Sequence, residues 1–372
     1  MKTLLVACRW VVGLLFIFSG LVKANDPLGL SYKMQEFFEV WGWHTLNDYT
    51  LAFSILMIAF EIIAGVAVII GWQMRLFSWL LLGLIVFFTF LTGYALLSGK
   101  IKACGCFGDC IPLTPTHSFI KDLVLLGLIL LLFANRNRMQ TATASRTSIL
   151  LLAASILFSF GFQWYVLRHL PVVDCLPYKK GKLISEQMKI PAGAIPDSSV
   201  ITFVYNRQGQ DVEFTADKFP DDFDDATYKF VKRYDKLIRK GNAEPPIKDF
   251  VLLSPGGSDT TQAILAQKGE QVWVFIRDLP GNETDDVKKV LSQLKAVSGN
   301  RNIPLYVITP VAEKVMTSLS ADLSGTTVFR SDAVAVKTAA RHDVTIYHIS
   351  NGAVVDKWSL PDASGALREL SR

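Results

Sequence analysis

The chain has 372 residues, of which 51% are hydrophobic and 19% are charged. The formal net charge of +5 is small and gathers in no basic stripe, so a nucleic-acid partner is not expected. Residues 1–170 are dense in Leu, Ile, Val and Phe, whereas residues 171–372 have the composition of an ordinary soluble domain. This division predicts a membrane-embedded half followed by a soluble half.

Five apolar segments in the first half are long enough to cross a bilayer, which takes about 20 mainly apolar residues. The segments are 4–22, 50–71, 76–97, 118–134 and 148–167. The first also resembles a signal peptide, but no Ala-x-Ala-like cleavage site follows it, and residues 23–26 are typical of a helix end. We therefore predict five transmembrane helices in contact with the lipid bilayer.

The basic residues between these segments predict the orientation. The 135–147 connection carries Arg136, Arg138 and Arg146 without an acidic residue, and the short turn before residue 76 carries Arg75. Positive loops favour the cytoplasm, although the opposite loops also hold lysines. The expected protein is thus a multi-pass protein of the inner membrane with a cytoplasmic N-terminus and a periplasmic C-terminal domain.

Two ionisable residues fall inside predicted transmembrane helices. Arg9 lies about two turns into the first helix, and Glu61 lies near the middle of the second. Because a charge in hydrocarbon is costly, such residues are functional candidates. Two interpretations remain open: a role in proton transfer or substrate binding, or a structural one in which Arg9 reaches the interface or pairs with Glu61.

The third and fourth segments are joined by a loop that carries three of the five cysteines. Cys104, Cys106 and Cys110 lie within seven residues, beside two glycines. Cys175 follows the fifth segment and is expected on the same outer face, where disulfides form and persist. The remaining thiol, Cys8, is expected to pack as a small hydrophobic side chain.

Three interpretations of these four cysteines compete. In the first, they exchange disulfides with a partner, which needs an accessible thiolate and a resolving cysteine nearby. In the second, structural disulfides tie the loop, with or without a bond to Cys175. In the third, Cys104, Cys106 and Cys110 bind zinc together with Cys175 or His117, although the C-x-C-x3-C spacing fits common zinc sites poorly. Redox exchange is the interpretation we favour, and no metal is expected.

Residues 171–250 are predicted to form an α+β linker subdomain outside the membrane. Strands are expected at 200–205 and 211–215 around a turn, followed by a helix that begins in the acidic stretch 221–225 and runs through Lys240. The acidic residues are expected to cap that helix. Calcium binding is a weaker alternative because the spacing lacks an EF-hand pattern.

Residues 251–372 alternate between strand and helix patterns and predict an α/β domain. The expected strands are 270–277, 303–309, 326–330, 344–349 and 353–358, with helices at 283–298, 311–319 and 332–341 and at the C-terminus. Asn351 and Gly352 predict a tight hairpin turn between the last two strands.

The membrane half resembles two related families. Residues 9–23, with Gly13, Ser19 and Gly20, resemble the first helix of DoxX-family proteins, and the Cys-Gly-Cys-Phe-Gly stretch at 104–108 resembles the cysteine signature of MauE. The resemblance covers residues 1–135 and implies a four-helix bundle distantly similar to vitamin K epoxide reductase and DsbB. MauE is linked to disulfide formation during maturation of methylamine dehydrogenase, and DoxX to quinone-coupled sulfur oxidation. Cys110, the fifth helix within 136–170 and the soluble tail depart from MauE, which puts methylamine metabolism in doubt.

The domain at 251–372 resembles thioredoxin-like proteins of the TlpA or peroxiredoxin type. A thioredoxin carries Cys-x-x-Cys after its first core strand, but residues 277–281 hold no cysteine here. Val344 stands where a cis-proline is expected. The overall expectation is a membrane all-α helical bundle of four plus one transmembrane helices, followed by an α/β thioredoxin-like domain without thiol chemistry of its own.

These observations lead to one functional hypothesis and two alternatives. The hypothesis is a membrane thiol–disulfide oxidoreductase in which Cys104 and Cys106 form or relay a disulfide, and Cys110 or Cys175 acts as the shuttle or resolving thiol. Arg9 and Glu61 would shape a carrier pocket, with a quinone as the expected acceptor and an extracytoplasmic thiol or disulfide protein as partner. The alternatives are a non-enzymatic membrane scaffold with a partner-binding outer domain, and a DoxX-like subunit in quinone-linked oxidation of sulfur compounds.

Overall fold

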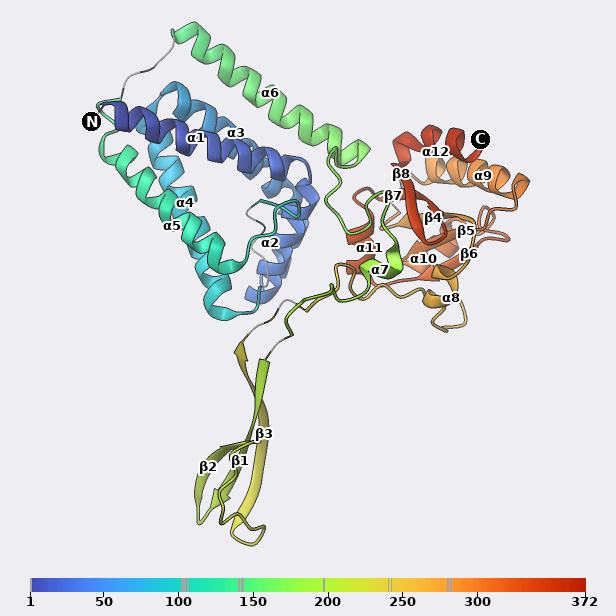
Figure 1. Ribbon diagram of the computed structural model, residues 1–372. Helices are drawn as coiled ribbons and strands as arrows, with labels where there is room; N and C mark the ends of the chain where they lie inside the picture. The colour runs from blue at the N-terminus through green and yellow to red at the C-terminus, as the bar shows by residue number, and fades with distance from the viewer. Residues whose placement is uncertain are drawn as a thin grey trace.

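The computed structural model describes residues 2–101, 105, 107–139, 141, 144–196, 198–239, 241, 243–279, 281 and 283–372. Three parts can be followed in Figure 1: a helical bundle, an α/β domain beside it, and a long β arm that projects away from both. The predicted combination of a membrane helical part and an α/β soluble domain is confirmed.

The helical part begins the chain. Its elements are α1 (Lys2–Ala24), α2 (Pro27–Trp41), the 3-10 helix η1 (His44–Tyr49), α3 (Thr50–Ile70), α4 (Met74–Ser98), α5 (Pro115–Ala134) and α6 (Ser145–His169). Among the described residues, five helical segments are long and apolar enough to span a membrane, and they coincide with the five predicted segments. The cysteine loop connects the end of α4 to the start of α5. We call this end of the bundle the loop end.

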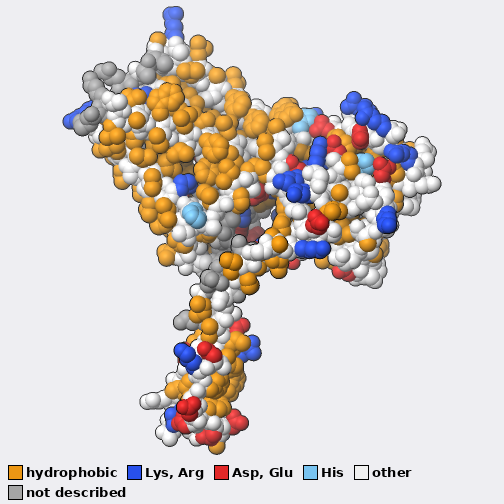
Figure 2. Space-filling model, viewed as in Figure 1, with side chains coloured by type: hydrophobic (Ala, Val, Ile, Leu, Met, Phe, Trp, Pro, Cys, Tyr) orange, Lys and Arg blue, Asp and Glu red, His pale blue; other side chains and the backbone are white. Residues whose placement is uncertain are grey.

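Close approach of α1 and α3 organises the bundle. A Cβ on Gly13 would lie 2.7 Å from the carbonyl oxygen of Gly65, and a Cβ on Gly65 would lie 2.7 Å from that of Gly13. Small residues are what allows two helix backbones to pack this tightly in a membrane. Large apolar side chains on the outer surfaces remain exposed, and Figure 2 shows them covering the bundle, as lipid contact requires.

The last membrane helix, α6, packs against α3 at the edge of the bundle. Gln163 is buried and its Nε2 donates to the carbonyl oxygen of Ile55 at 3.3 Å. Leu152 joins the apolar core that α1, α3, α4 and α5 share. The fifth helix is therefore part of the packed membrane domain and also leads the chain to the soluble domain.

One helix of this half, α2, was not predicted. Its N-cap is Asp26, whose carboxylate accepts from the backbone N–H of Gly29 at 3.0 Å, and Pro27 follows at the first helical position. Its mean hydropathy is too low for a transmembrane segment, yet it buries Leu28, Leu30 and Phe37 against the loop end of the bundle. Burial of one face explains why a search for apolar segments overlooks it.

The soluble domain is built on a five-stranded sheet in the order β6-β5-β4-β7-β8. In chain order its elements are α7 (Ile184–Gln187), α8 (Thr261–Leu265), β4 (Glu270–Ile276), α9 (Thr284–Asn300), β5 (Leu305–Thr309), α10 (Ala312–Ser318), β6 (Thr327–Arg330), α11 (Ala333–Ala339), β7 (Val344–Ser350), β8 (Ala353–Ser359), η2 (Leu360–Asp362) and α12 (Ala363–Leu370). Strands β4, β5 and β6 are parallel, while β7 and β8 form an antiparallel hairpin. The predicted strand and helix order is confirmed; the likeness to thioredoxin stays a prediction.

Both faces of this sheet are covered. On one face Val272 and Val274 of β4 pack against α9 and α12, which lie side by side in Figure 1. On the other face Trp273 and Phe275 pack against α11 and the segment around Phe250. Residues 272–276 of β4 are thus all apolar because the strand is buried on both sides, which is typical of a central strand.

The β arm comprises β1 (Ser198–Arg207), β2 (Gln210–Thr215) and β3 (Tyr228–Arg239), in the antiparallel order β2-β1-β3. The two early strands were predicted, but the helix expected through Lys240 is wrong, because the described part of that segment is β3. Its aromatic and β-branched residues favour a strand paired along β1. Aromatic rings fill the space between the strands and the 216–227 connection, among them Tyr205, Phe219 and Phe223.

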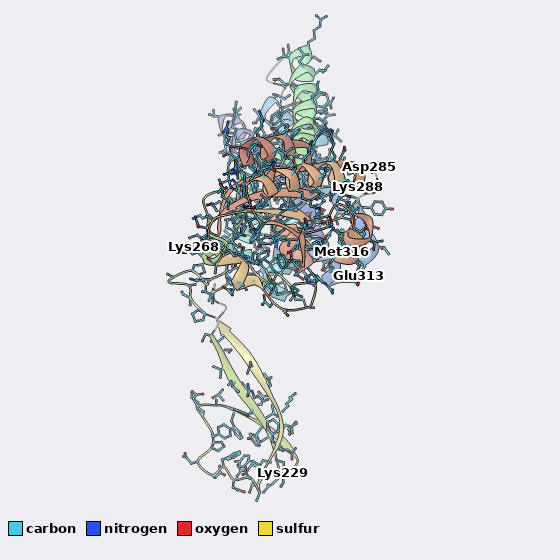
Figure 3. All side chains as sticks on the ribbon, turned by 90° about the vertical axis from the view of Figure 1, so that its right-hand side faces the viewer. Lys229, Lys268, Asp285, Lys288, Glu313 and Met316 are labelled. Carbon is cyan, nitrogen blue, oxygen red and sulfur yellow. A yellow bond between two sulfur atoms is a disulfide. The ribbon has the colours of Figure 1, made fainter. Side chains whose placement is uncertain are left out.

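The arm is expected to fold as a unit separate from the rest. Its tip, marked by Lys229 in Figure 3, lies far from the α/β domain, and its base is narrow: the N–H of Ala243 donates to the carbonyl oxygen of Ile195 at 3.2 Å. Replacing residues 198–239 by a short Gly-Ser linker should therefore shift the unfolding temperature by no more than about 4 °C. Phe275→Ala, in the buried sheet, should lower it further than the deletion does. A deletion that unfolds the chain in a thermal scan would contradict this view of the arm.

Candidate functional site

A disulfide joins the cysteine loop to the segment that follows α6. Cys110 and Cys175 are separated by 65 residues, and their Cα atoms are 4.9 Å apart. This contact brings together two of the four cysteines that the sequence placed on one face. The other two, Cys104 and Cys106, lie outside the described residues.

The described part of the loop folds back onto the bundle. The N–H of Gly108 donates to the carbonyl oxygen of Gly105 at 3.0 Å, and Gly105 has φ of +66°, a conformation that glycine adopts without strain. Phe107 points onto α1, where its ring centroid lies 5.7 Å from that of Phe18. The loop is therefore anchored by an aromatic side chain between its cysteines.

Two polar contacts hold the segment that carries Cys175. Asn25, at the end of α1, pairs in both directions with the backbone of Val173, at 2.8 Å and 2.9 Å. Asp174 forms an ion pair with Lys357 of β8, with 2.8 Å between Nζ and Oδ2. Cys175 is thus positioned by the bundle on one side and by the α/β domain on the other.

Arg341, after α11, clamps the α/β domain onto the loop end. Its Nε donates to Asp26 at 2.8 Å and its Nη2 to Asp109 at 3.0 Å, next to Cys110 in the chain. The Arg341 side chain is only 5% exposed. Burial works to lower the pKa of Arg341, but the negative charges of Asp26 and Asp109 outweigh it and raise that pKa, so the guanidinium stays charged.

Tyr32 of α2 forms the second contact between the two halves. Its hydroxyl accepts from Nη1 of Arg277 at 2.6 Å, and its ring lies under the charged groups of Lys337 and Arg341. Arg277 also pairs with Asp343. Burial is the main cause that raises the pKa of the Tyr32 hydroxyl, so it stays protonated and neutral at ordinary pH.

An apolar cavity of about 440 Å³ lies inside the bundle and reaches the cysteine loop. Helices α1 to α5 all contribute to its wall, and the loop contributes Gly105 and Phe107. Gly105 stands between Cys104 and Cys106 in the sequence. The cavity therefore extends from the cysteine motif into the membrane interior.

Two buried polar groups line this cavity. In the first, Nζ of Lys23 lies 2.5 Å from Oε1 of Glu61, and the hydroxyl of Ser19 donates to Oε2 at 2.9 Å. In the second, Thr92 donates to Asp122 at 3.0 Å and Lys121 pairs with Asp122. These groups bring charge into walls that are otherwise apolar and aromatic.

The two charged residues singled out in the sequence lie in different surroundings. Glu61 lines the cavity, but its cationic partner is Lys23 and not the expected Arg9. Arg9 donates to the carbonyl oxygens of Val68 and Ile69, where α3 ends away from the cysteine loop. Residues 23–26 were predicted as a helix end, and Lys23 is the residue before the last one of α1.

The zinc interpretation named Cys104 and Cys106, which lie outside the described residues, together with Cys110 and either Cys175 or His117. Within the described ranges, no group of three His, Cys, Asp or Glu side chains is placed to hold a metal ion. Cys110 and Cys175 are joined to each other, and Nδ1 of His117 lies 2.7 Å from the hydroxyl of Thr114 at the start of α5. Cys8 is buried and contacts the carbonyl oxygen of Leu128, consistent with a packing role.

The Arg341 clamp should protect the Cys110–Cys175 disulfide from reduction. Removing one member of a buried ion pair costs about 3–5 kcal/mol because the partner charge is left uncompensated. Arg341→Met should therefore open the interface and raise the rate at which dithiothreitol reduces this disulfide by at least about tenfold. Arg368→Met, on the exposed side of α12, is the matched control and should leave the rate unchanged. Equal rates in both variants and the wild type would show that the clamp does not cover the disulfide.

Comparison with known proteins agrees with the division seen in the structure. Residues 1–135 match the family model described as Methylamine utilisation protein MauE, and residues 199–240, almost the same as the β arm, match a domain of unknown function (DUF8463). Protein TlpB of Flavobacterium psychrophilum is 28% identical over 136 residues, which is 34% of this chain and 35% of TlpB. The chain therefore matches about a third of that relative's length, and no solved structure matches it. Residues 1–135 are thus similar to the MauE family, and the similarity stops before α6 and the soluble domain.

Proposed function

We propose that this protein is a membrane thiol–disulfide oxidoreductase that passes electrons between extracytoplasmic thiols and a carrier in the bilayer. The observation that carries the proposal is the position of the cysteine loop. One end of it forms the Cys110–Cys175 disulfide, and Gly105 and Phe107 line a cavity inside the bundle. A loop placed in this way can exchange disulfides on one side and electrons on the other.

In this proposal the four cysteines act in two pairs. Cys110 and Cys175 form the outer pair, which receives electrons from a substrate thiol by thiolate attack on the disulfide. Cys104 and Cys106 form the inner pair, which takes those electrons by a second exchange. Each exchange breaks one S–S bond and forms another, so the outer pair is oxidised again as the inner pair is reduced.

The α/β domain has a positioning role in this mechanism. Residues 277–281 carry no thiol, and Arg277 binds Tyr32 of the membrane half instead. The domain therefore holds the loop through Arg341 and the segment that carries Cys175 through Lys357, and the β arm is available to contact a partner. We propose that the soluble domain and the loop end face the periplasm, with the N-terminus in the cytoplasm, as the basic loops predict.

A scaffold without redox activity is the second candidate. The observation that favours it is the Cys110–Cys175 bond itself, because it ties the loop to the segment that enters the soluble domain and so acts as a staple. The two candidates differ in the redox behaviour of this bond. A structural disulfide typically has a potential below about −300 mV, whereas an exchanging one lies higher.

The first test is a thiol-trapping titration of the full chain in membranes. Samples are poised at graded redox potentials and alkylated with a mass tag, and the pairing of the four cysteines is mapped by mass spectrometry. At least one pair should titrate reversibly between about −270 and −120 mV. If all four cysteines stay oxidised, or all four stay reduced, at every potential, the oxidoreductase proposal is wrong.

The relay between the pairs is tested by removing the inner one. After reduction and removal of the reductant, the outer pair in the Cys104→Ser, Cys106→Ser double variant should reoxidise at least about tenfold more slowly than in the wild type, because its electrons have no acceptor nearby. Cys8→Ser, which changes the buried cysteine of α1, is the control and should reoxidise normally. Reoxidation of the double variant at the wild-type rate would exclude a relay through Cys104 and Cys106.

A further inference from the structure

A second cavity lies where the end of α6 meets the α/β domain, and we call it the junction cavity. Its volume is about 440 Å³, within the range of about 300–1,000 Å³ that small-molecule sites occupy. One side is formed by the end of α6 and the residues after it, and the other side by the α/β domain. The lining residues include His169, Leu170, Val172, Lys179, Lys180 and Lys357. Both halves of the molecule therefore contribute to one site.

Three lysines stand on the α/β side of the junction cavity. The segment that carries Lys179 and Lys180 is joined to the edge strand β8, because the N–H of Gly181 donates to the carbonyl oxygen of Val354 at 2.8 Å. Lys357 belongs to β8 itself, so this pairing brings the three side chains to the same wall. A concave wall with several cationic groups attracts an anion.

Lys357 presents a buried charge to this cavity. Its side chain is 8% exposed, and burial lowers the pKa of Lys357, although Asp174, 2.8 Å from its Nζ, acts to raise it. An ammonium carries three N–H donors, and Asp174 is the one acceptor that the described residues offer to it. An anion in the cavity can accept another of these hydrogen bonds and so offset part of the cost of burying the charge.

The two exposed lysines differ in their surroundings. Lys180 lies 2.5 Å from Oδ1 of Asp356. Lys179 has no ion-pair partner among the residues that the structure describes. A phosphate ester supplies the anion that Lys179 lacks. The ammonium of a zwitterionic headgroup would instead add a cation beside three others, which favours a headgroup with a net negative charge.

The junction cavity lies at the depth expected for lipid headgroups. Its wall begins at His169, the last residue of a membrane-spanning helix. Trp164 and Tyr165, about one turn earlier, are exposed on α6, and such aromatic side chains are typical of the membrane–water interface. Val172 and Val173 are 61% and 60% exposed just after α6, where they can contact the glycerol and acyl region of a lipid. A small soluble anion would gain nothing from this apolar border.

From these features we infer that the junction cavity binds the phosphate of an anionic phospholipid headgroup. The phosphate oxygens accept from Lys179, Lys180 and Lys357, and the acyl chains extend along α6 into the bilayer. The bound lipid contacts the bundle and the α/β domain at once, so it links the two halves beside the segment that carries Cys175. The inference does not depend on the proposed redox activity.

Binding is measured by native mass spectrometry of the full-length protein in detergent, titrated with phosphatidylglycerol. The Lys179→Gln, Lys180→Gln double variant should bind at least about tenfold more weakly, because two of the three cationic contacts are lost. The Lys268→Gln, Lys289→Gln double variant is the matched control: it removes the same charge from exposed lysines outside the cavity and should bind like the wild type. Equal affinity in all three proteins would mean nonspecific binding to the apolar surface of the bundle and would overturn the inference.

Lys357 is tested together with its partner. The Lys357→Met, Asp174→Asn double variant removes both charges and so leaves no lone buried ion. It should bind phosphatidylglycerol about tenfold more weakly, since a hydrogen bond to a charged group contributes about that factor. A thermal scan shows whether the variant is folded. Unchanged affinity in the folded variant would show that the lipid does not reach Lys357 and would refute the site.

Competition identifies the source of the phosphate. Phosphatidylglycerol should stay bound in a large excess of inorganic phosphate, and phosphatidylcholine should bind at least about tenfold more weakly than phosphatidylglycerol. Displacement by inorganic phosphate would identify a site for a soluble anion and overturn the lipid assignment. Equal binding of the two lipids would refute selection by the charge of the headgroup.

Discussion

Three segments far apart in the sequence meet at one point, and the arrangement of the molecule depends on that meeting. Cys110 of the loop is bonded to Cys175 after α6, and Arg341 of the α/β domain binds Asp109 beside it. The covalent bond fixes the loop to the exit of the membrane domain. The buried Arg341 then holds the soluble domain against the loop and the exit of the membrane domain, because it forms ion pairs with Asp26 and Asp109.

A second constraint acts within the membrane, where every charge must be paired or solvated. Lys23 and Glu61 satisfy it by pairing, and so do Lys121 and Asp122. Gly13 and Gly65 show that α1 and α3 pack closely without a contribution from charged groups at that contact. The charged pairs are therefore better explained by the cavity that they line than by the stability of the fold.

The sequence predicts the parts of this structure that depend on local pattern. Apolar segments located the five spans, and short apolar runs that alternate with helical segments located the strands of the central sheet. Helix α2 was missed because only one of its faces is buried, and β3 was taken for a helix because acidic residues precede it. The Arg341 clamp lies beyond such reasoning, since its partners stand 315 and 232 residues away and nothing local marks them.

Arg277 of the α/β domain connects the two halves of the molecule. It stands just past β4, where a thioredoxin-like domain would carry its cysteines, and there it binds Tyr32 of the membrane half. A redox site at that position would have needed to face a soluble partner. Here the same end of the sheet is used for docking, and Cys110 and Cys175 lie at the surface that it docks to. In the proposed function, thiol chemistry thus belongs to the membrane loop, and the α/β domain supports that loop.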